Sequence, residues 1–138
     1  MEEHIGFIGL GNIGKPIVDN IARGGYALSV YDLAGTKERA PMGSFVASSV
    51  SQVAERANIV FLCLPSLSSI ATVVAEICKA NCQDDAVVVN TSTAGPTAAR
   101  AAYDQLSQKG IHYADAPISG SVARAGEAQL AVMFSGEE

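Results

Sequence analysis

The chain has 138 residues, of which 49% are hydrophobic and 17% charged, so it is expected to form one globular domain with a continuous core. Nine Lys and Arg against fourteen Asp and Glu give a formal net charge of −5, which disfavours a nucleic-acid-binding surface. The longest apolar run, Ile59 to Leu64, is far shorter than the roughly 20 residues that a membrane span requires.

The first residues carry no basic stretch followed by an apolar segment, so we expect no secretory signal peptide and a cytoplasmic location. The three cysteines are an odd number, and we expect them to be free thiols. Cys78 and Cys82 lie four residues apart, but His4 and His112 are remote from them in sequence, so no metal site is expected.

Strands and helices are predicted to alternate along the first half of the chain. The apolar run from Ile5 to Ile8 predicts a buried strand, and a helical pattern follows it until the Gly24-Gly25 pair, which is typical of a helix end. The apolar positions of that helix are Ile13, Ile17, Val18 and Ile21. The next predicted elements are a strand from Ala27 to Tyr31, a short strand at Phe45-Val46, and a helix capped by Ser49 that ends near Arg56.

The second half continues the alternation. Ile59 to Leu64 is the strongest strand pattern, and Ser68 or Ser69 is predicted to cap the following helix, whose apolar face includes Ile70 and Val74. The remaining predicted elements are a strand from Ala86 to Asn90, a helix from about Pro96 to Lys109, and strands from His112 to Ala116 and from Leu130 to Phe134. This order predicts an α/β fold of the doubly wound Rossmann type, a mainly parallel sheet with helices on both faces.

A glycine-rich turn directly follows the first strand and opens the first helix. It reads Gly9-Leu10-Gly11-Asn12-Ile13-Gly14, the G-x-G-x-x-G pattern of dinucleotide-binding proteins. Gly9 permits a tight turn, Gly11 leaves room for a pyrophosphate, and Gly14 lets the helix pack closely on the strand. The alternative is a turn that opens a helix and binds no ligand; the strand before it and the helix after it favour the dinucleotide site.

Asp32 lies at the end of the second predicted strand, eighteen residues after Gly14. A carboxylate at this place accepts hydrogen bonds from the ribose hydroxyls of NAD and repels the 2′-phosphate of NADP. We therefore predict NAD as the cofactor, with NADP disfavoured.

The segment from Gly9 to Lys15 also fits the start of a Walker A phosphate-binding loop. That loop requires a Ser or Thr hydroxyl at the next position to bind Mg²⁺. Pro16 occupies this position, so an ATPase is not expected.

The segment from Gly6 to Ile17, GFIGLGNIGKPI, closely resembles the N-terminal signature of the β-hydroxyacid dehydrogenases. This family includes 3-hydroxyisobutyrate dehydrogenase, tartronate semialdehyde reductase and 6-phosphogluconate dehydrogenase. Ile13 and Ile17 stand where the family usually has Met, and both are volume-conserving changes.

Three later segments match the same family in the expected order. Leu64-Pro65 resembles its Leu-Pro, which implies a contact on the adenosine side of the cofactor, where we also expect Ser69. Thr91-Ser92-Thr93 resembles its Ser-Ser-Thr, which implies that Thr93 lies near the nicotinamide. Asp115 to Ser121 resembles its substrate-binding segment, which implies substrate contacts for Ser119, Gly120 and Ser121. Ser121 departs from the usual Ser-Gly-Gly, and its side chain is expected to narrow the turn.

The resemblance implies hydride transfer between NAD and the hydroxyl-bearing carbon of a small 3-hydroxy acid or related sugar acid. The general acid/base in this family is a lysine on a later helix, expected beyond Glu138, and none of Lys15, Lys37, Lys79 and Lys109 fits that setting. We therefore interpret residues 1–138 as the NAD(P)-binding domain without the all-helical catalytic and dimerisation domain. By itself the chain is expected to be inactive, and the full-length protein to be a homo-oligomer.

The sequence alone leaves two other functions open. A non-catalytic nucleotide-sensing module has a similar Rossmann unit, although it has no use for the segment from Asp115 to Ser121. An imine reductase shares the glycine-rich turn but commonly prefers NADP, which Asp32 disfavours.

Overall fold

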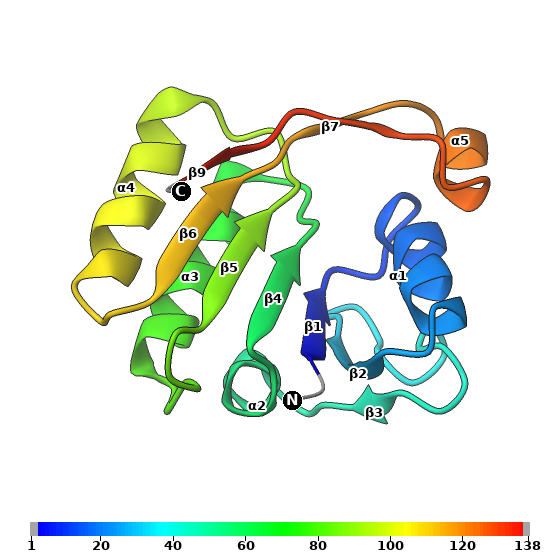
Figure 1. Cartoon of the computed structure of the whole chain (residues 1–138), viewed down its shortest axis with the longest axis horizontal. Coiled ribbons are helices and arrows are strands. Elements are labelled where there is room, and N and C mark those ends of the chain that lie inside the picture. Colours follow the sequence, from blue (N-terminus) through cyan, green and yellow to red (C-terminus); the bar gives the residue numbers. More distant parts are fainter. Residues whose placement is uncertain (1–2, 137–138) are drawn as a thin grey trace.

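The computed structural model describes residues 3–136, so the expected domain ends at Met1 and Glu138 lie outside the described residues. Its main sheet has seven strands: β1 (His4–Ile8), β2 (Ala27–Tyr31), β3 (Phe45–Val46), β4 (Ile59–Leu62), β5 (Val87–Asn90), β6 (His112–Asp115) and β9 (Ser135–Gly136). Their order across the sheet is β3-β2-β1-β4-β5-β6-β9 (Figure 1). All neighbouring strands are parallel except β9, which is antiparallel to β6. The predicted mainly parallel sheet is confirmed.

The sheet has apolar side chains on both faces because successive residues of a strand point to opposite sides. In β1, Phe7 belongs to the cluster that includes Val18 and Leu28, whereas Ile8 belongs to the cluster that includes Val74 and Leu106. Each of these side chains is at most 5% exposed, so β1 is buried on both sides.

Helices lie on both faces, as predicted. Helix α1 (Gly14–Arg23) packs on the first face through Val18, and α2 (Val50–Arg56), α3 (Leu67–Lys79) and α4 (Pro96–Ser107) cover the other. Figure 1 shows α3 behind β5 and β6 and α4 to the left of β6, with α1 on the right-hand side beside β1. This two-sided arrangement buries β1 and β4 at the centre and gathers their carboxyl ends at one edge.

The first residues of two helices show how local sequence sets the boundaries. Ser49 caps α2 as predicted, because its hydroxyl accepts the Gln52 N–H at 3.1 Å. The prediction that Ser68 or Ser69 caps α3 is wrong. Ser66 is the cap, and Ser69 is the third helical residue of a capping box, with its hydroxyl accepting the Ser66 N–H at 3.2 Å.

The predicted strand from Leu130 to Phe134 is present only in part, and it does not join the main sheet as expected. Ala131–Val132 forms β8, which pairs antiparallel with β7 (Ile118–Ser119) in a separate two-stranded sheet. The seventh strand of the main sheet is β9, just after the predicted segment. Between β7 and β8 lies a further helix, α5 (Val122–Gly126), so residues 117–134 leave the main sheet and return to it.

Among residues 3–136, no helix is long and apolar enough to cross a membrane.

Candidate functional site

A cavity of about 990 Å³ lies at the carboxyl ends of β1, β2, β4 and β5. The strand order reverses beside β1, whose neighbours are β2 and β4, and ligands of doubly wound folds bind at such a point. The volume is at the upper end of the usual range for small-molecule sites. Eleven of the residues predicted from sequence line this cavity: Gly9, Gly11, Asn12, Ile13, Gly14, Asp32, Leu64, Pro65, Ser69, Thr93 and Gly120.

Three predicted residues do not line the cavity. Leu10 is buried beneath the glycine-rich turn and contributes its backbone N–H to Asp32. Ser119 and Ser121 are exposed, and the Ser121 hydroxyl caps α5 by accepting the Arg124 N–H at 3.2 Å. The side chain of Ser121 therefore caps the local helix and does not line the cavity.

The glycine-rich turn passes close to neighbouring backbone. Gly9 has a φ of +105°, and a Cβ at this position would lie 2.0 Å from the carbonyl oxygen of Cys63. A Cβ at Gly14 would lie 2.0 Å from the carbonyl oxygen of Gly9 and 3.3 Å from the Phe7 ring. Larger residues cannot occupy either place without movement of the backbone, so these two glycines hold the turn against β4 and α1.

Gly11 differs from both, because a Cβ built there meets no protein atom within 4 Å. The space in front of Gly11 belongs to the cavity. Beside it begins α1, whose first turn has no side-chain cap and no acidic residue. Uncapped N–H groups and the positive end of the helix dipole attract an anion, so the turn and helix fit a phosphate group.

Asp32 connects this turn to the end of β2. Its Oδ2 atom accepts the Leu10 N–H at 2.6 Å, and its Oδ1 atom accepts the Ala34 N–H at 2.7 Å. The side chain is 13% exposed at the cavity wall. A carboxylate has about four lone-pair sites, so one acceptor position remains on each oxygen. Asp32 can therefore receive two neighbouring hydroxyl groups.

Arg39 also lines the cavity and was not predicted. Its Nη1 atom lies 3.5 Å from Oδ2 of Asp32. The sequence signal was present, since Arg39 is a basic residue seven positions after the acidic one, but only the fold of the intervening loop brings the two side chains together.

The opposite wall is made by the end of β4 and by α3. The Ser92 hydroxyl accepts the Leu64 N–H at 2.8 Å, and the Thr91 hydroxyl donates to the Leu62 carbonyl at 2.6 Å. These bonds connect β5 to β4 and fix the position of Leu64. The α3 residues on this wall include four that were not predicted, although their helical spacing from Ser69 indicates one face. They are Ser68, Thr72, Val73 and Glu76.

Few groups in the cavity suit acid, base or nucleophilic chemistry. Burial raises the pKa of the Cys63 thiol, opposed by a hydrogen bond with Thr91, and a protonated thiol is a poor nucleophile. Among the described residues, no lysine or histidine lines the cavity. Within residues 3–136, no group of three or more His, Cys, Asp or Glu side chains is arranged to hold a metal ion. Cys63, Cys78 and Cys82 are free thiols.

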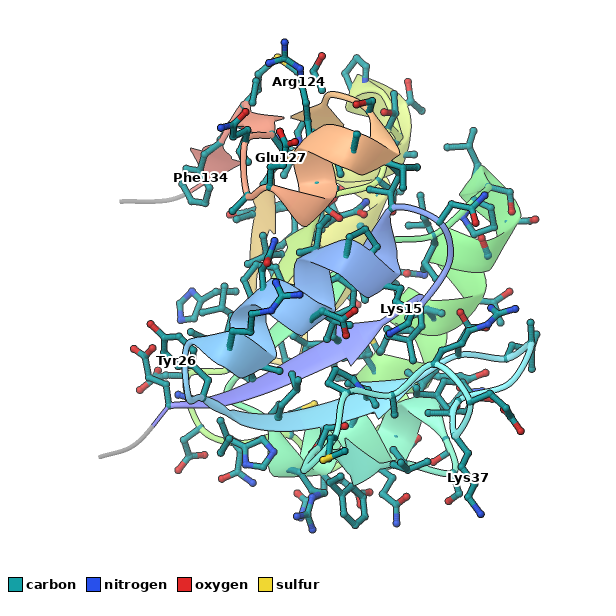
Figure 2. All side chains as sticks on the ribbon, turned by 90° about the vertical axis from the view of Figure 1, so that its right-hand side faces the viewer. Lys15, Tyr26, Lys37, Arg124, Glu127 and Phe134 are labelled. Carbon is teal, nitrogen blue, oxygen red and sulfur yellow. The ribbon has the colours of Figure 1, made fainter. Side chains whose placement is uncertain are left out.

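The segment from β7 to β8 reaches from the end of β6 back to α1. The Asn20 side-chain amide donates to the Ala125 carbonyl at 2.8 Å, which attaches α5 to α1. Figure 2 shows α5, with Arg124 and Glu127, beside α1. Within this segment Ile118 and Gly120 line the cavity, so residues far apart in sequence meet there.

Asp115, which begins the predicted substrate segment, does not line the main cavity. Its Oδ1 atom accepts the Tyr113 hydroxyl at 3.3 Å, beside a smaller cavity next to α4. Burial raises the pKa of the Asp115 carboxyl, and the hydrogen bond from Tyr113 opposes this increase.

Residues 4–138 match the family model described as the NAD binding domain of 6-phosphogluconate dehydrogenase. The chain is 30% identical over 138 residues to the mitochondrial 3-hydroxyisobutyrate dehydrogenase of Drosophila melanogaster, covering 99% of this chain and 43% of that one. It is 30% identical over 139 residues to the NAD-dependent L-serine dehydrogenase of Pseudomonas aeruginosa. This match covers 98% of this chain and 47% of that one.

Among solved structures, the 3-hydroxyisobutyrate dehydrogenase of Mycobacterium tuberculosis with L-serine superposes with a TM-score of 0.92 at 28% identity. The match covers all of this chain and 48% of the other. The chain thus spans less than half the length of these relatives.

Proposed function

The chain belongs to the family described as the NAD binding domain of 6-phosphogluconate dehydrogenase, and from this premise we propose that its main cavity binds NAD for a hydroxyacid dehydrogenase. The resemblance to the N-terminal domain of the β-hydroxyacid dehydrogenases is confirmed. The nicotinamide cofactor follows from the family, and the preference for NAD over NADP is our proposal.

The open space in front of Gly11 carries this proposal. Protein atoms fill the space that a Cβ would take at Gly9 and at Gly14, so packing alone explains why these residues have no side chain. Gly11 has no such explanation within the protein. A pyrophosphate against the uncapped end of α1 would use that space and would accept its N–H groups.

Asp32 supports the choice of NAD. Its two backbone hydrogen bonds orient the carboxylate toward the cavity and leave one acceptor position on each oxygen. The neighbouring 2′- and 3′-hydroxyls of a ribose would fill both positions. A 2′-phosphate would bring a second negative charge to the same place.

Thr93 and Gly120 lie where the ends of β5 and β7 meet the cavity, and we propose that they border the nicotinamide and the substrate. When bound, the nicotinamide would supply the hydride acceptor for oxidation of the hydroxyl-bearing carbon of a small hydroxy acid. The proton of that hydroxyl needs a general base. We propose that this group comes from the part of the relatives that this chain does not match.

Cofactor binding is tested by isothermal titration of the chain with NAD and NADH. Wild type is expected to bind one equivalent saturably, and Gly11→Ala to weaken binding about tenfold or more, because the methyl group occupies the pyrophosphate position. Gly126→Ala is the matched control, since a Cβ there also meets nothing within 4 Å but lies outside the cavity. Absence of saturable binding by wild type would contradict the proposal.

Turnover is tested with 3-hydroxyisobutyrate and L-serine, the compounds in the names of the relatives. We expect no NADH formation by this chain alone, and NADH formation by the full-length protein. Binding of NAD without any turnover by the full-length protein would favour a nucleotide-sensing module instead.

The proposal also includes a cytoplasmic location and, for the full-length protein, a homo-oligomer. Cell fractionation checks the first, and light scattering during size-exclusion chromatography checks the second.

A further inference from the structure

We propose that Asn90 is a positioning residue for the nicotinamide end of the cavity, acting through the turn formed by Thr91, Ser92 and Thr93. This inference rests on the proposed function, in which Thr93 borders the nicotinamide. Asn90 itself does not line the cavity, so it acts on the cofactor only through the residues that do.

The turn after β5 connects the centre of the sheet to the cavity. Asn90 is the last residue of β5 and is completely buried, and its Oδ1 atom accepts the Ser92 N–H at 3.0 Å. A side-chain oxygen that accepts the N–H two residues later forms an Asx-turn. The Ser92 hydroxyl in turn accepts the Leu64 N–H at 2.8 Å. With Ser92 held at both groups, Thr91 and Thr93 line the cavity on either side of it.

A second bond sets the orientation of the Asn90 amide. Its Nδ2 atom donates to the Tyr113 hydroxyl at 3.3 Å, and that hydroxyl donates to Oδ1 of Asp115 at 3.3 Å. Burial raises the pKa of Tyr113, the hydrogen bond from Asn90 opposes this increase, and the charge of Asp115 adds to it, so the phenol keeps its proton. A hydroxyl that gives its proton to Asp115 can only accept from Asn90, and the Ser92 N–H can only donate. The amide therefore has one orientation in which both of its ends are paired.

These hydrogen bonds form a continuous series from Leu64 to Asp115, with Asn90 in the middle. The bonds on the cavity side of Asn90 are 2.8 and 3.0 Å long, whereas those on the other side are both 3.3 Å, so the contact with Ser92 is the stronger one. Loss of the Asn90 amide leaves the N–H of the buried Ser92 without its acceptor. An unpaired buried N–H is costly, so the turn is expected to shift until this group finds another partner.

The first test separates the two ends of the cofactor by titration with NAD and with ADP-ribose, which lacks the nicotinamide. Asn90→Ala is expected to weaken binding of NAD about fivefold, because the turn at Thr93 shifts, and binding of ADP-ribose less than about twofold. Equal weakening for the two ligands, or no weakening for either, would overturn the inference. Equal affinities of wild type for NAD and ADP-ribose would overturn it as well, because the nicotinamide would then make no contact to be positioned.

Asn58→Ala is the matched control for this comparison. The Oδ1 atom of Asn58 also accepts a backbone N–H, that of His4 at 2.7 Å. Asn58 lies just before β4, at the opposite ends of the strands from the cavity, and it does not line the cavity. The variant is expected to leave the affinities for both ligands unchanged. A selective loss of NAD binding in Asn58→Ala would overturn the inference, because any lost amide would then have the same effect.

The second test asks whether Asn90 acts through Ser92. Asn90→Ser keeps a hydroxyl that can accept the Ser92 N–H, so it is expected to restore part of the NAD affinity that Asn90→Ala loses. In Asn90→Ala/Ser92→Ala the loss is expected to be no larger than the larger single loss, because both residues hold the same turn. Losses that add in the double variant would overturn the inference.

Two of these variants keep the inference testable if Asn90→Ala does not fold. Asn90→Ser and Ser92→Ala are each expected to weaken binding of NAD more than binding of ADP-ribose, and equal effects on the two ligands would overturn the inference. Failure of wild type to bind either ligand would instead overturn the proposed function.

Discussion

Gly14 lies so close to Gly9 that a Cβ on Gly14 would be 2.0 Å from the Gly9 carbonyl oxygen. This contact closes the glycine-rich turn at the start of α1 and positions the uncapped end of the helix at the cavity. The same motif contains Gly11, where a Cβ would touch nothing. One short motif thus combines two glycines that are packed against protein atoms with a third that faces the open space of the cavity.

Gly14→Ala is expected to destabilise the protein by about 2 kcal/mol or more, because the new methyl group must displace backbone and not a flexible side chain. The measurement is the free energy of unfolding in urea. Gly11→Ala and Gly126→Ala are expected to stay within about 0.5 kcal/mol of wild type. A large loss of stability in Gly11→Ala would show that Gly11 also has a folding role.

Asp32→Ala is expected to lower the free energy of unfolding by about 1–3 kcal/mol, because the backbone N–H groups of Leu10 and Ala34 both lose their acceptor. Thermal and urea unfolding measure this loss. Asp32→Asn keeps one acceptor oxygen, so an intermediate stability is expected. Equal stability of Asp32→Ala and wild type would mean that water replaces both bonds without cost.

The stability of the domain is expected to fall as the pH is lowered through the titration of His4. Burial, and then the charge of Arg56, lower the pKa of His4 below 6.5, and its Nε2 atom lies 2.7 Å from the buried Ser29 hydroxyl. A histidine with a lowered folded-state pKa contributes stability above the unfolded value of about 6.5. This contribution is lost as the pH falls through the lower, folded-state value.

Urea unfolding of wild type and His4→Gln between about pH 7 and pH 5 measures this effect. The variant keeps a side-chain amide near Ser29 but has no titrating group, so its stability is expected to depend less on pH over this interval. Parallel pH profiles for the two proteins would assign the dependence to other groups.

Asn20→Ala is expected to release α5 from α1, because the Asn20 amide is the donor to the Ala125 carbonyl. Hydrogen exchange of the amides in residues 117–134 is expected to become faster, while amides of β1 and β4 stay protected. Ser121→Ala is a useful comparison, since it removes the cap of α5 and leaves the contact with α1 in place. Unchanged exchange in Asn20→Ala would show that packing of Ala125 alone holds the segment.

The amino-acid sequence determined the alternation of strands and helices, the glycine-rich turn and the place of Asp32 at the end of β2. These features depend on neighbouring residues: hydrophobic periodicity, glycine at a tight turn and the end of an apolar run. The cap at Ser49 was predicted for the same reason. At α3 several serines competed for the cap, and only the structure showed that Ser66 is the one with the required backbone conformation.

The tertiary structure determined the chain path and the long-range contacts that the sequence pattern could not predict. Strands β7 and β9 have two residues each and were not predicted, and β8 was predicted as part of the main sheet although it pairs with β7, so the path of residues 117–134 was not predicted correctly. The contact between Asp32 and Arg39 and that between Asn20 and Ala125 join residues 7 and 105 positions apart, counted from their numbers. Such contacts depend on how the chain folds in space. The sequence identified the cofactor turn, and the fold showed which other residues surround it.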